Sequence, residues 1–220
     1  MTRTTSPRTP APRSAPRSAA RLAALAPVLA VVAGSLFAAS PAVAATRHSG
    51  RQAQSARACA NATAQADRAS AQAMRHAVVC LINRQRTSRH LPALGELKRL
   101  DNSAQSWTDV MVWRDVFDHV ALGSDPGARI SAAGFSWSSI GENIATGYPT
   151  PRDVVSAWMS STGHCQNILS PSFRYIGQGV STRAIRGISS GPATWTTDFG
   201  LPAGASAPSG NRGPANRCPY

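Results

Sequence analysis

Three side chains able to do acid–base or metal chemistry lie beside glycines or in a loop of this sequence: His119, Glu142 and His164. The whole chain holds only ten acidic residues and five histidines. Glu142 follows Gly141 and His164 follows Gly163, and a small neighbour leaves a polar side chain open to approach. A histidine and a carboxylate form a general acid–base pair, and two imidazoles with a carboxylate can ligate zinc. We therefore expect the three side chains to converge on one cleft.

Two amphipathic helices must position His119. The first has its apolar residues on one helical face, at positions 74, 77, 78, 81 and 82, and Pro92 prevents its continuation. The second is predicted over residues 97–115, where apolar residues recur at alternating spacings of three and four. His119 follows in a stretch without periodicity. Taken alone, a histidine there is typical of a structural or solvent-facing residue as well as of a functional one.

A short third helix and an extended element must position Glu142. Asp125 is a suitable N-cap, Pro126 suits the first helical position, and Gly134 is a stop signal. Glu142 then falls at the start of a new element, which we expect to be a strand or an extended edge. Taken alone, this carboxylate could equally be a cap or an ion-pair partner.

A fourth helix must position His164. Thr150 is a suitable cap and Pro151 suits the first helical position. Gly163 is predicted to end this helix in a left-handed turn. His164 would then lie just past a helix C-terminus, where the dipole favours the protonated imidazole unless a metal holds it neutral.

The pattern changes period after Pro171. Residues 175–181 and 194–199 alternate as strands do, and a connection containing glycine, serine and proline joins them. They are predicted to form an antiparallel hairpin. The predicted helices come first in the chain and the predicted strands come late. This order indicates the α+β class, in which helices are layered on a sheet, rather than a parallel doubly wound sheet.

The N-terminal segment has the order of a secretory signal. Five arginines precede an apolar run over residues 22–39, and Ala42-Val43-Ala44 has the small residues of a signal-peptide cleavage site. We predict a signal peptide over residues 1–44, with an uncleaved membrane anchor as the alternative. An N-terminal arm over residues 45–73 follows, then one domain over 74–202 and a tail rich in glycine and proline over 203–220.

The charge balance indicates anionic partners. The chain carries a formal net charge of +13, and removing the five leading arginines leaves about +8. Such a surface attracts acidic wall polymers or anionic lipid headgroups, through a field that salt screens. Nucleic acid is not expected as a partner, because the arginines are scattered and the chain is exported.

Four cysteines remain in the exported chain, and an even number in an oxidising compartment predicts two disulfides. Three pairings are possible. We favour Cys59 with Cys80, which would link the arm to the first helix. We also favour Cys165 with Cys218, which would link the tail to the chain near His164. No Cys-x-x-Cys pair supports a cysteine zinc site or a thioredoxin-type redox site.

Several short motifs together resemble the bacterial form of the CAP superfamily, which comprises cysteine-rich secretory proteins, antigen 5 and pathogenesis-related 1 proteins and is also called the SCP-like domain. The resemblance covers about residues 74–202, and it is specific through the order and spacing of its parts. The matching motifs are Cys80-Leu81-Ile82-Asn83, Phe117-Asp118-His119, Arg129-Ile130, Gly141-Glu142-Asn143-Ile144, Trp158-Met159, Gly163-His164, Asn167-Ile168-Leu169, Gly177-Gln178-Gly179 and Asp198-Phe199-Gly200.

The resemblance implies a three-layer α-β-α sandwich with a small antiparallel sheet. It also implies a cleft with two histidines and two acids, a tetrad that binds a divalent metal in some members of the family. The first histidine falls on His119, the first acid on Glu142 and the second histidine on His164. The second acid falls on Ser161, so three of the four groups are kept. Zinc at His119, Glu142 and His164 is therefore an expectation weakened by the loss of one negative charge.

The resemblance and the residues together favour a non-enzymatic extracellular binding module, whose cleft takes a lipid, a peptide or a wall fragment. The alternative is a hydrolase, such as a peptidase, that uses a metal-bound or histidine-activated water. Ser161 could be a nucleophile near His164 or simply a polar residue at a helix end, and no Gly-x-Ser-x-Gly or His-Glu-x-x-His motif is present. A third possibility is a structural envelope protein with a vestigial cleft.

Overall fold

The computed structural model describes residues 59–208 and Cys218. The predicted signal peptide, most of the predicted arm and most of the tail lie outside the described residues. Within the described part, no helix is both long and apolar enough to span a bilayer. The elements, in chain order, are α2 (Ala71–Thr87), β1 (Gly95–Glu96), α3 (Lys98–Arg114), α4 (Pro126–Ala132), β2 (Trp137–Thr146), α5 (Pro151–Met159), α6 (Thr162–Ile168), β3 (Tyr175–Ser181) and β4 (Thr194–Pro202).

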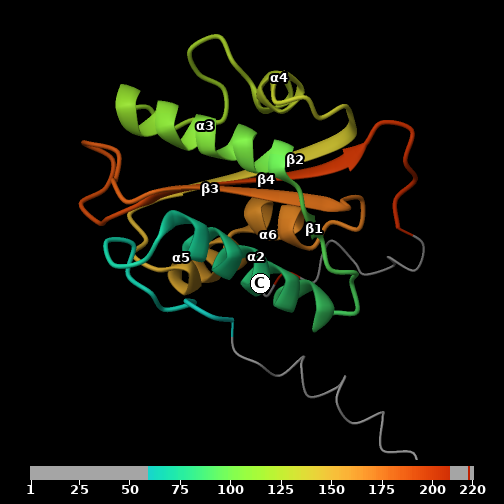
Figure 1. Ribbon diagram of the computed structural model, residues 1–220, viewed down its shortest axis with the longest axis horizontal. Helices are drawn as coiled ribbons and strands as arrows, with labels where there is room; N and C mark the ends of the chain where they lie inside the picture. Colours follow the sequence, from blue (N-terminus) through green and yellow to red (C-terminus); the bar gives the residue numbers. More distant parts are fainter. Residues whose placement is uncertain (1–58, 209–217, 219–220) are drawn as a thin grey trace, which may run out of the picture. The chain divides into compact units, whose positions relative to one another are not determined.

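A four-stranded sheet forms the central layer, with strand order β1-β3-β4-β2. Helices α3 and α4 cover one face, and α2, α5 and α6 cover the other (Figure 1). The α+β class and the three-layer sandwich are thus confirmed. The predicted hairpin of β3 and β4 is antiparallel, and β4 also pairs antiparallel with β2. The two-residue strand β1 pairs parallel with β3, so the sheet is mixed rather than wholly antiparallel.

Helices α4 and α5 each begin directly after a residue that caps the helix N-terminus. The side chain of Asp125 accepts a hydrogen bond from the backbone N–H of Ala128, and Thr150 accepts one from Asp153. Both caps precede a proline at the start of the helix, which lacks the N–H that would otherwise need a partner. The predicted second helix over 97–115 agrees with α3 to within one residue at each end.

Helix α3 lies directly on strand β3, because two glycines of the strand leave room for its backbone. A Cβ added to Gly177 would lie 2.1 Å from the carbonyl carbon of Leu100, and one added to Gly179 would lie 2.3 Å from the carbonyl oxygen of Ala104. No side chain fits between the two layers at these points. This close approach fixes α3 and, through it, the loop that carries His119.

Two expectations near the site were wrong. Strand β2 begins at Trp137, so Glu142 lies inside the strand rather than at its start. Gly163 does not end a helix: α5 ends at Met159, and Gly163 and His164 lie in the first turn of a separate helix, α6. The helical geometry is interrupted at Ser161, whose backbone is extended (φ −121°, ψ 127°). Ser161 is the N-cap of the new helix.

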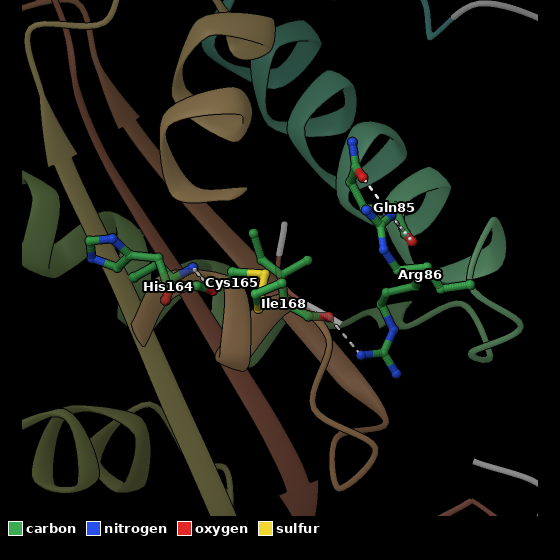
Figure 2. Close-up of a disulfide and its surroundings, with 8 residues drawn as sticks. Gln85, Arg86, His164, Cys165 and Ile168 are labelled. Atoms are coloured by element: carbon green, nitrogen blue, oxygen red, sulfur yellow. Dashed lines mark hydrogen bonds between the residues drawn. A yellow bond between two sulfur atoms is a disulfide. The ribbon is translucent and has the colours of Figure 1, made fainter. Parts of the chain in front are cut away.

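Helix α6 is anchored on the side away from the sheet. The predicted disulfides Cys59–Cys80 and Cys165–Cys218 are both formed, and the second joins α6 to the tail. Arg86 of α2 is fully buried, and its Nη1 donates to the carbonyl oxygen of Ile168 at 2.8 Å (Figure 2). The same atom donates to the carbonyl oxygen of Ser170 at 2.8 Å. Burial lowers the pKa of Arg86 to about 10, so its guanidinium remains charged at neutral pH.

Substitution of Gly177 by alanine is expected to destabilise the protein by about 1–3 kcal/mol, because the new methyl group forces α3 away from β3. Chemical denaturation of both forms measures the difference.

Gly163→Ala is the matched control. A Cβ at Gly163 meets nothing within 4 Å, so this variant should be unchanged or more stable by up to about 1 kcal/mol. Equal stability of Gly177→Ala and the wild type would contradict the close packing.

Candidate functional site

Glu142 is the buried centre of the site. Its side chain points from the edge strand β2, and only 2% of it is exposed. Its Oε1 lies 2.8 Å from Nδ1 of His119, and its Oε2 accepts a hydrogen bond from Nη2 of Arg129 at 2.7 Å. Both carboxylate oxygens are therefore engaged. This pairing offsets the cost of burying the negative charge.

His119 is the partly exposed partner of Glu142. An ionised carboxylate can only accept hydrogen bonds, so the proton of a neutral His119 must sit on Nδ1. This tautomer leaves Nε2 able to accept a proton, and 43% of the side chain is exposed. The geometry is that of an imidazole oriented by a carboxylate, as in a general base.

Arg129 holds the His119 loop against Glu142. Besides its bond to Glu142, its Nη2 donates to the backbone carbonyl of His119 at 3.1 Å. Its guanidinium carbon lies 3.8 Å from the centroid of the Trp107 ring of α3, a favourable cation–π arrangement. The indole N–H of Trp107 donates to the backbone carbonyl of Asp118, the neighbour of His119. One arginine of α4 thus connects α3, β2 and the loop.

A second buried acid, Asp198 of β4, lies opposite Glu142 in the antiparallel register. It is 1% exposed. Burial, followed by the negative charge of Glu142, raises the pKa of Asp198 well above its usual value. The site therefore favours a neutral carboxyl group behind the ionised pair of Glu142 and Arg129.

His164 lies close enough to His119 for their charges to interact. Burial, and then the positive charge of His119, lowers the pKa of His164 below its usual value. This is opposite to the expectation that a helix C-terminus would stabilise its protonated form. The expectation failed because His164 lies in the first turn of α6 rather than after a helix C-terminus, and burial there disfavours the charged imidazole.

Two asparagines tie α6 to β2 at this point. Asn143 donates from Nδ2 to the backbone carbonyl of His164 at 3.1 Å. Asn167 donates from Nδ2 to the carbonyl of Glu142 at 3.1 Å and to Oδ1 of Asn143 at 2.9 Å. In Figure 2 the imidazole of His164 points away from Ile168 and Arg86. The asparagines thus fix the backbone of His164 from the strand side.

A cleft of about 400 Å³ opens beside His164. Ser161 lines it too, and its hydroxyl makes no capping bond to α6. His119 and Glu142 are not part of its wall, although Phe117, two residues before His119, is. Most of the wall is apolar or small, and it comprises Phe117, Ile144, Ala145, Thr146, Tyr148, Ala157, Trp158, Ser161, His164, Ile188 and Ser189.

The predicted site residues are thus brought together in two groups. His119 and Glu142 are hydrogen-bonded, whereas His164 and Ser161 share the adjacent cleft. Arg129 and Asp198 have roles that the sequence did not assign. A signal existed for Asp198, since it is the one acid in β4, a strand whose residues are buried from Thr194 to Leu201. Arg129 was noted in the sequence only as part of the Arg129-Ile130 motif, which gave no indication of its contacts.

The expected metal ligands do not fit a dication in this arrangement. Both oxygens of Glu142 are engaged, and the guanidinium of Arg129 puts a positive charge 2.7 Å from the carboxylate. Over residues 59–208 and Cys218, no group of three histidine, cysteine or acidic side chains is placed to hold a metal ion. We therefore derive no chemistry through a metal.

The family to which the three-layer sandwich and its His119–Glu142 pair are compared comes from the sequence matches. Residues 79–187 match the model of the CAP family, described as the cysteine-rich secretory protein family. This match and the relative described next support a protein of the CAP superfamily.

The relatives found are bacterial proteins. The chain is 39% identical over 124 residues to the uncharacterized protein YkwD of Bacillus subtilis strain 168, a match over 56% of this chain and 45% of the relative. The chain therefore spans less than half the length of this curated relative.

Two solved structures share the fold. One is an extracellular protein containing an SCP domain from Bacillus anthracis, with a TM-score of 0.52 and 21% identity over 60% of this chain and 44% of that one. The other is an outer surface protein of Borrelia burgdorferi, with a TM-score of 0.51 and 20% identity over 57% of this chain and 90% of that one. At these identities the likeness concerns the fold alone.

Substitution of His119 by asparagine is expected to raise the pKa of His164 part of the way to its ordinary value. The substitution removes the repulsion from a protonated His119 but leaves the larger effect of burial. A titration of the imidazole signals by NMR measures the shift.

His76→Asn is the control, because His76 pairs with Glu96 and is 56% exposed. It should leave the titration of His164 unchanged. A His164 that titrates above the usual histidine range in the wild type would contradict the proposed environment.

Proposed function

We propose that this CAP-domain protein acts outside the cell as a non-enzymatic binding module, and that the cleft beside His164 takes the apolar part of a lipid, peptide or wall ligand. The observation that carries the proposal is the cleft itself. Its volume of about 400 Å³ lies within the range of small-ligand sites, and it combines apolar walls with few polar groups. His164 and Ser161 are polar groups that could orient a ligand there.

Exposed apolar side chains near this cleft support binding. Phe117 is 38% exposed and Ile188 54% exposed, and both belong to the wall of the cleft. An apolar ligand that covers such side chains gains about 25 cal/mol for each Å² removed from water.

The two disulfides support a location outside the cytoplasm, because such bonds persist in oxidising compartments. The predicted signal peptide points to the same location. The neutral His164 adds a hydrogen-bonding group without a charge that an apolar ligand would have to desolvate.

Substitution of Phe117 by alanine is expected to weaken the binding of a fluorescent long-chain fatty acid by about tenfold, because it removes an aromatic ring from the wall of the cleft. Leu122→Ala removes an exposed apolar side chain outside this wall and should change the affinity by less than about twofold. Fluorescence titration measures both. Equal affinities of wild type and Phe117→Ala would place the ligand elsewhere.

A hydrolase is the second candidate function, and the oriented imidazole of His119 is the observation that favours it. When Nδ1–H of His119 donates to Oε1 of Glu142, Nε2 is left free to take a proton from water. A catalytic role would need a substrate carbonyl near this atom. It would also need groups that stabilise the oxyanion formed on attack.

The wild-type protein, incubated with a panel of peptides and esters with and without added zinc, is expected to show no turnover above buffer. Turnover that falls at least about a hundredfold in both His119→Ala and Glu142→Gln would favour the hydrolase instead. Turnover that survives both substitutions would point to a contaminating enzyme. Liquid chromatography with mass detection identifies the products.

A further inference from the structure

A second hollow lies between helices α2 and α5. Both helices belong to the layer that covers the sheet face opposite α3 and α4 (Figure 1). Its volume is about 630 Å³, larger than that of the cleft beside His164. We call it the arginine groove, because Arg84, Arg89 and Arg152 line it. Arg84 lies in the last turn of α2, Arg89 just after that helix, and Arg152 in the first turn of α5.

The positive charge of the arginine groove is not balanced by nearby acids. No carboxylate belongs to its wall. Within the described part of the chain, the guanidinium groups of Arg84 and Arg152 form no ion pair and no hydrogen bond. The nearest acid in sequence, Asp153, accepts a hydrogen bond from the hydroxyl of Thr150 at 2.7 Å. The arginine side chains are therefore available to a ligand.

One of the three arginines is held in place. Nη1 of Arg89 donates to the backbone carbonyl of Gln85 at 2.9 Å and to its side-chain Oε1 at 2.7 Å. These bonds leave the other guanidinium N–H groups of Arg89 free. A held arginine loses less conformational entropy when it binds an anion, so it adds to affinity at lower cost.

The remaining polar groups of the groove suit an oxyanion. Ser156 and Ser160 add hydroxyl groups beside the three guanidinium groups, whereas the hydroxyl of Ser88 already donates to the backbone carbonyl of Gln85. Guanidinium groups pair with phosphate oxygens through two parallel hydrogen bonds, which gives both strength and orientation. The groove therefore has the chemistry of a phosphate-binding surface.

The spread of the charges favours a chain of phosphates over a single one. Arg84 lies in the last turn of α2 and Arg89 lies beyond the end of that helix, in a hollow of about 630 Å³. Arg152 comes from the other helix. One phosphate group cannot fill such a span, whereas the repeated charges of a linear polymer can meet each arginine in turn.

A membrane surface is the less suitable partner. The large apolar side chains that are exposed in the described residues are Trp113, Phe117, Val120, Leu122, Trp137 and Ile188, and none of them lines the arginine groove. A protein that lies on a bilayer inserts such side chains beside its basic groups. Charge without apolar anchors fits a polymer in water.

We propose that the arginine groove between α2 and α5 binds the phosphodiester backbone of a linear anionic polymer, at a site separate from the cleft beside His164. The polymer contacts at least three arginines at once. The protein would thus hold to an anionic matrix through one helical layer while its cleft stays open on the other side of α5.

The test measures binding of poly(glycerol phosphate) to the full exported chain by calorimetry at several salt concentrations. Three phosphate contacts predict that the logarithm of affinity falls with the logarithm of salt with a slope of about −2. The triple variant Arg84→Gln, Arg89→Gln, Arg152→Gln should lower the affinity by about tenfold or more and flatten this slope.

The matched control is Arg68→Gln, Arg114→Gln, Arg174→Gln. These three arginines are exposed and form no ion pair within the described residues. Their substitution removes the same positive charge as the triple substitution in the groove. This control should change the affinity by less than about threefold. An equal loss in both triple variants would show that net charge alone attracts the polymer and would overturn the proposal.

Two further outcomes would also overturn it. Inorganic phosphate bound as tightly as the polymer would indicate a single-anion site. Groove-dependent binding to phosphatidylglycerol vesicles, without binding to the polymer, would indicate a membrane partner.

The double variant Arg84→Gln, Arg152→Gln spares Arg89 and its bonds to Gln85. It therefore tests the groove even if the triple variant folds poorly. Unaltered binding of fatty acid in the cleft confirms that the double variant is folded.

Discussion

The buried carboxylate of Glu142 is the constraint on which the rest of the site depends. A charge that is 2% exposed is costly unless partners replace the lost water. His119 and Arg129 supply these partners from two different segments, the loop after α3 and helix α4. Their contacts bring three elements together at the edge strand β2. The ion pair is therefore a structural junction as well as a candidate functional group.

Much of the fold could be predicted because local rules and the tertiary structure agree. Asp125 and Thr150 each precede a proline, and this arrangement determines where α4 and α5 begin. The alternating residues of β3 and β4 reflect a strand pair in the centre of the sheet. The resemblance to the CAP superfamily then supplied what periodicity could not, namely that His119, Glu142 and His164 lie near one another.

What could not be predicted rests on contacts between distant segments. The break at Ser161 is decided by packing, because Gly163 can either end a helix or continue one. The role of Arg129 depends on the ring of Trp107 and on Glu142, neither of which its neighbours in sequence reveal. The pKa of Asp198 is set by burial beneath α3 and by a carboxylate on the next strand. Such effects exist only once the layers are assembled.

The disulfide between Cys165 and Cys218 has a consequence for when the cleft becomes complete. Cys165 is the immediate neighbour of His164, so the bond restrains the backbone beside a cleft residue in addition to the Asn143 and Asn167 contacts. In a reducing compartment that restraint is missing, and the tail is not joined to α6. With the location outside the cell that is proposed above, this disulfide would form only after export, and the cleft would reach its final geometry there.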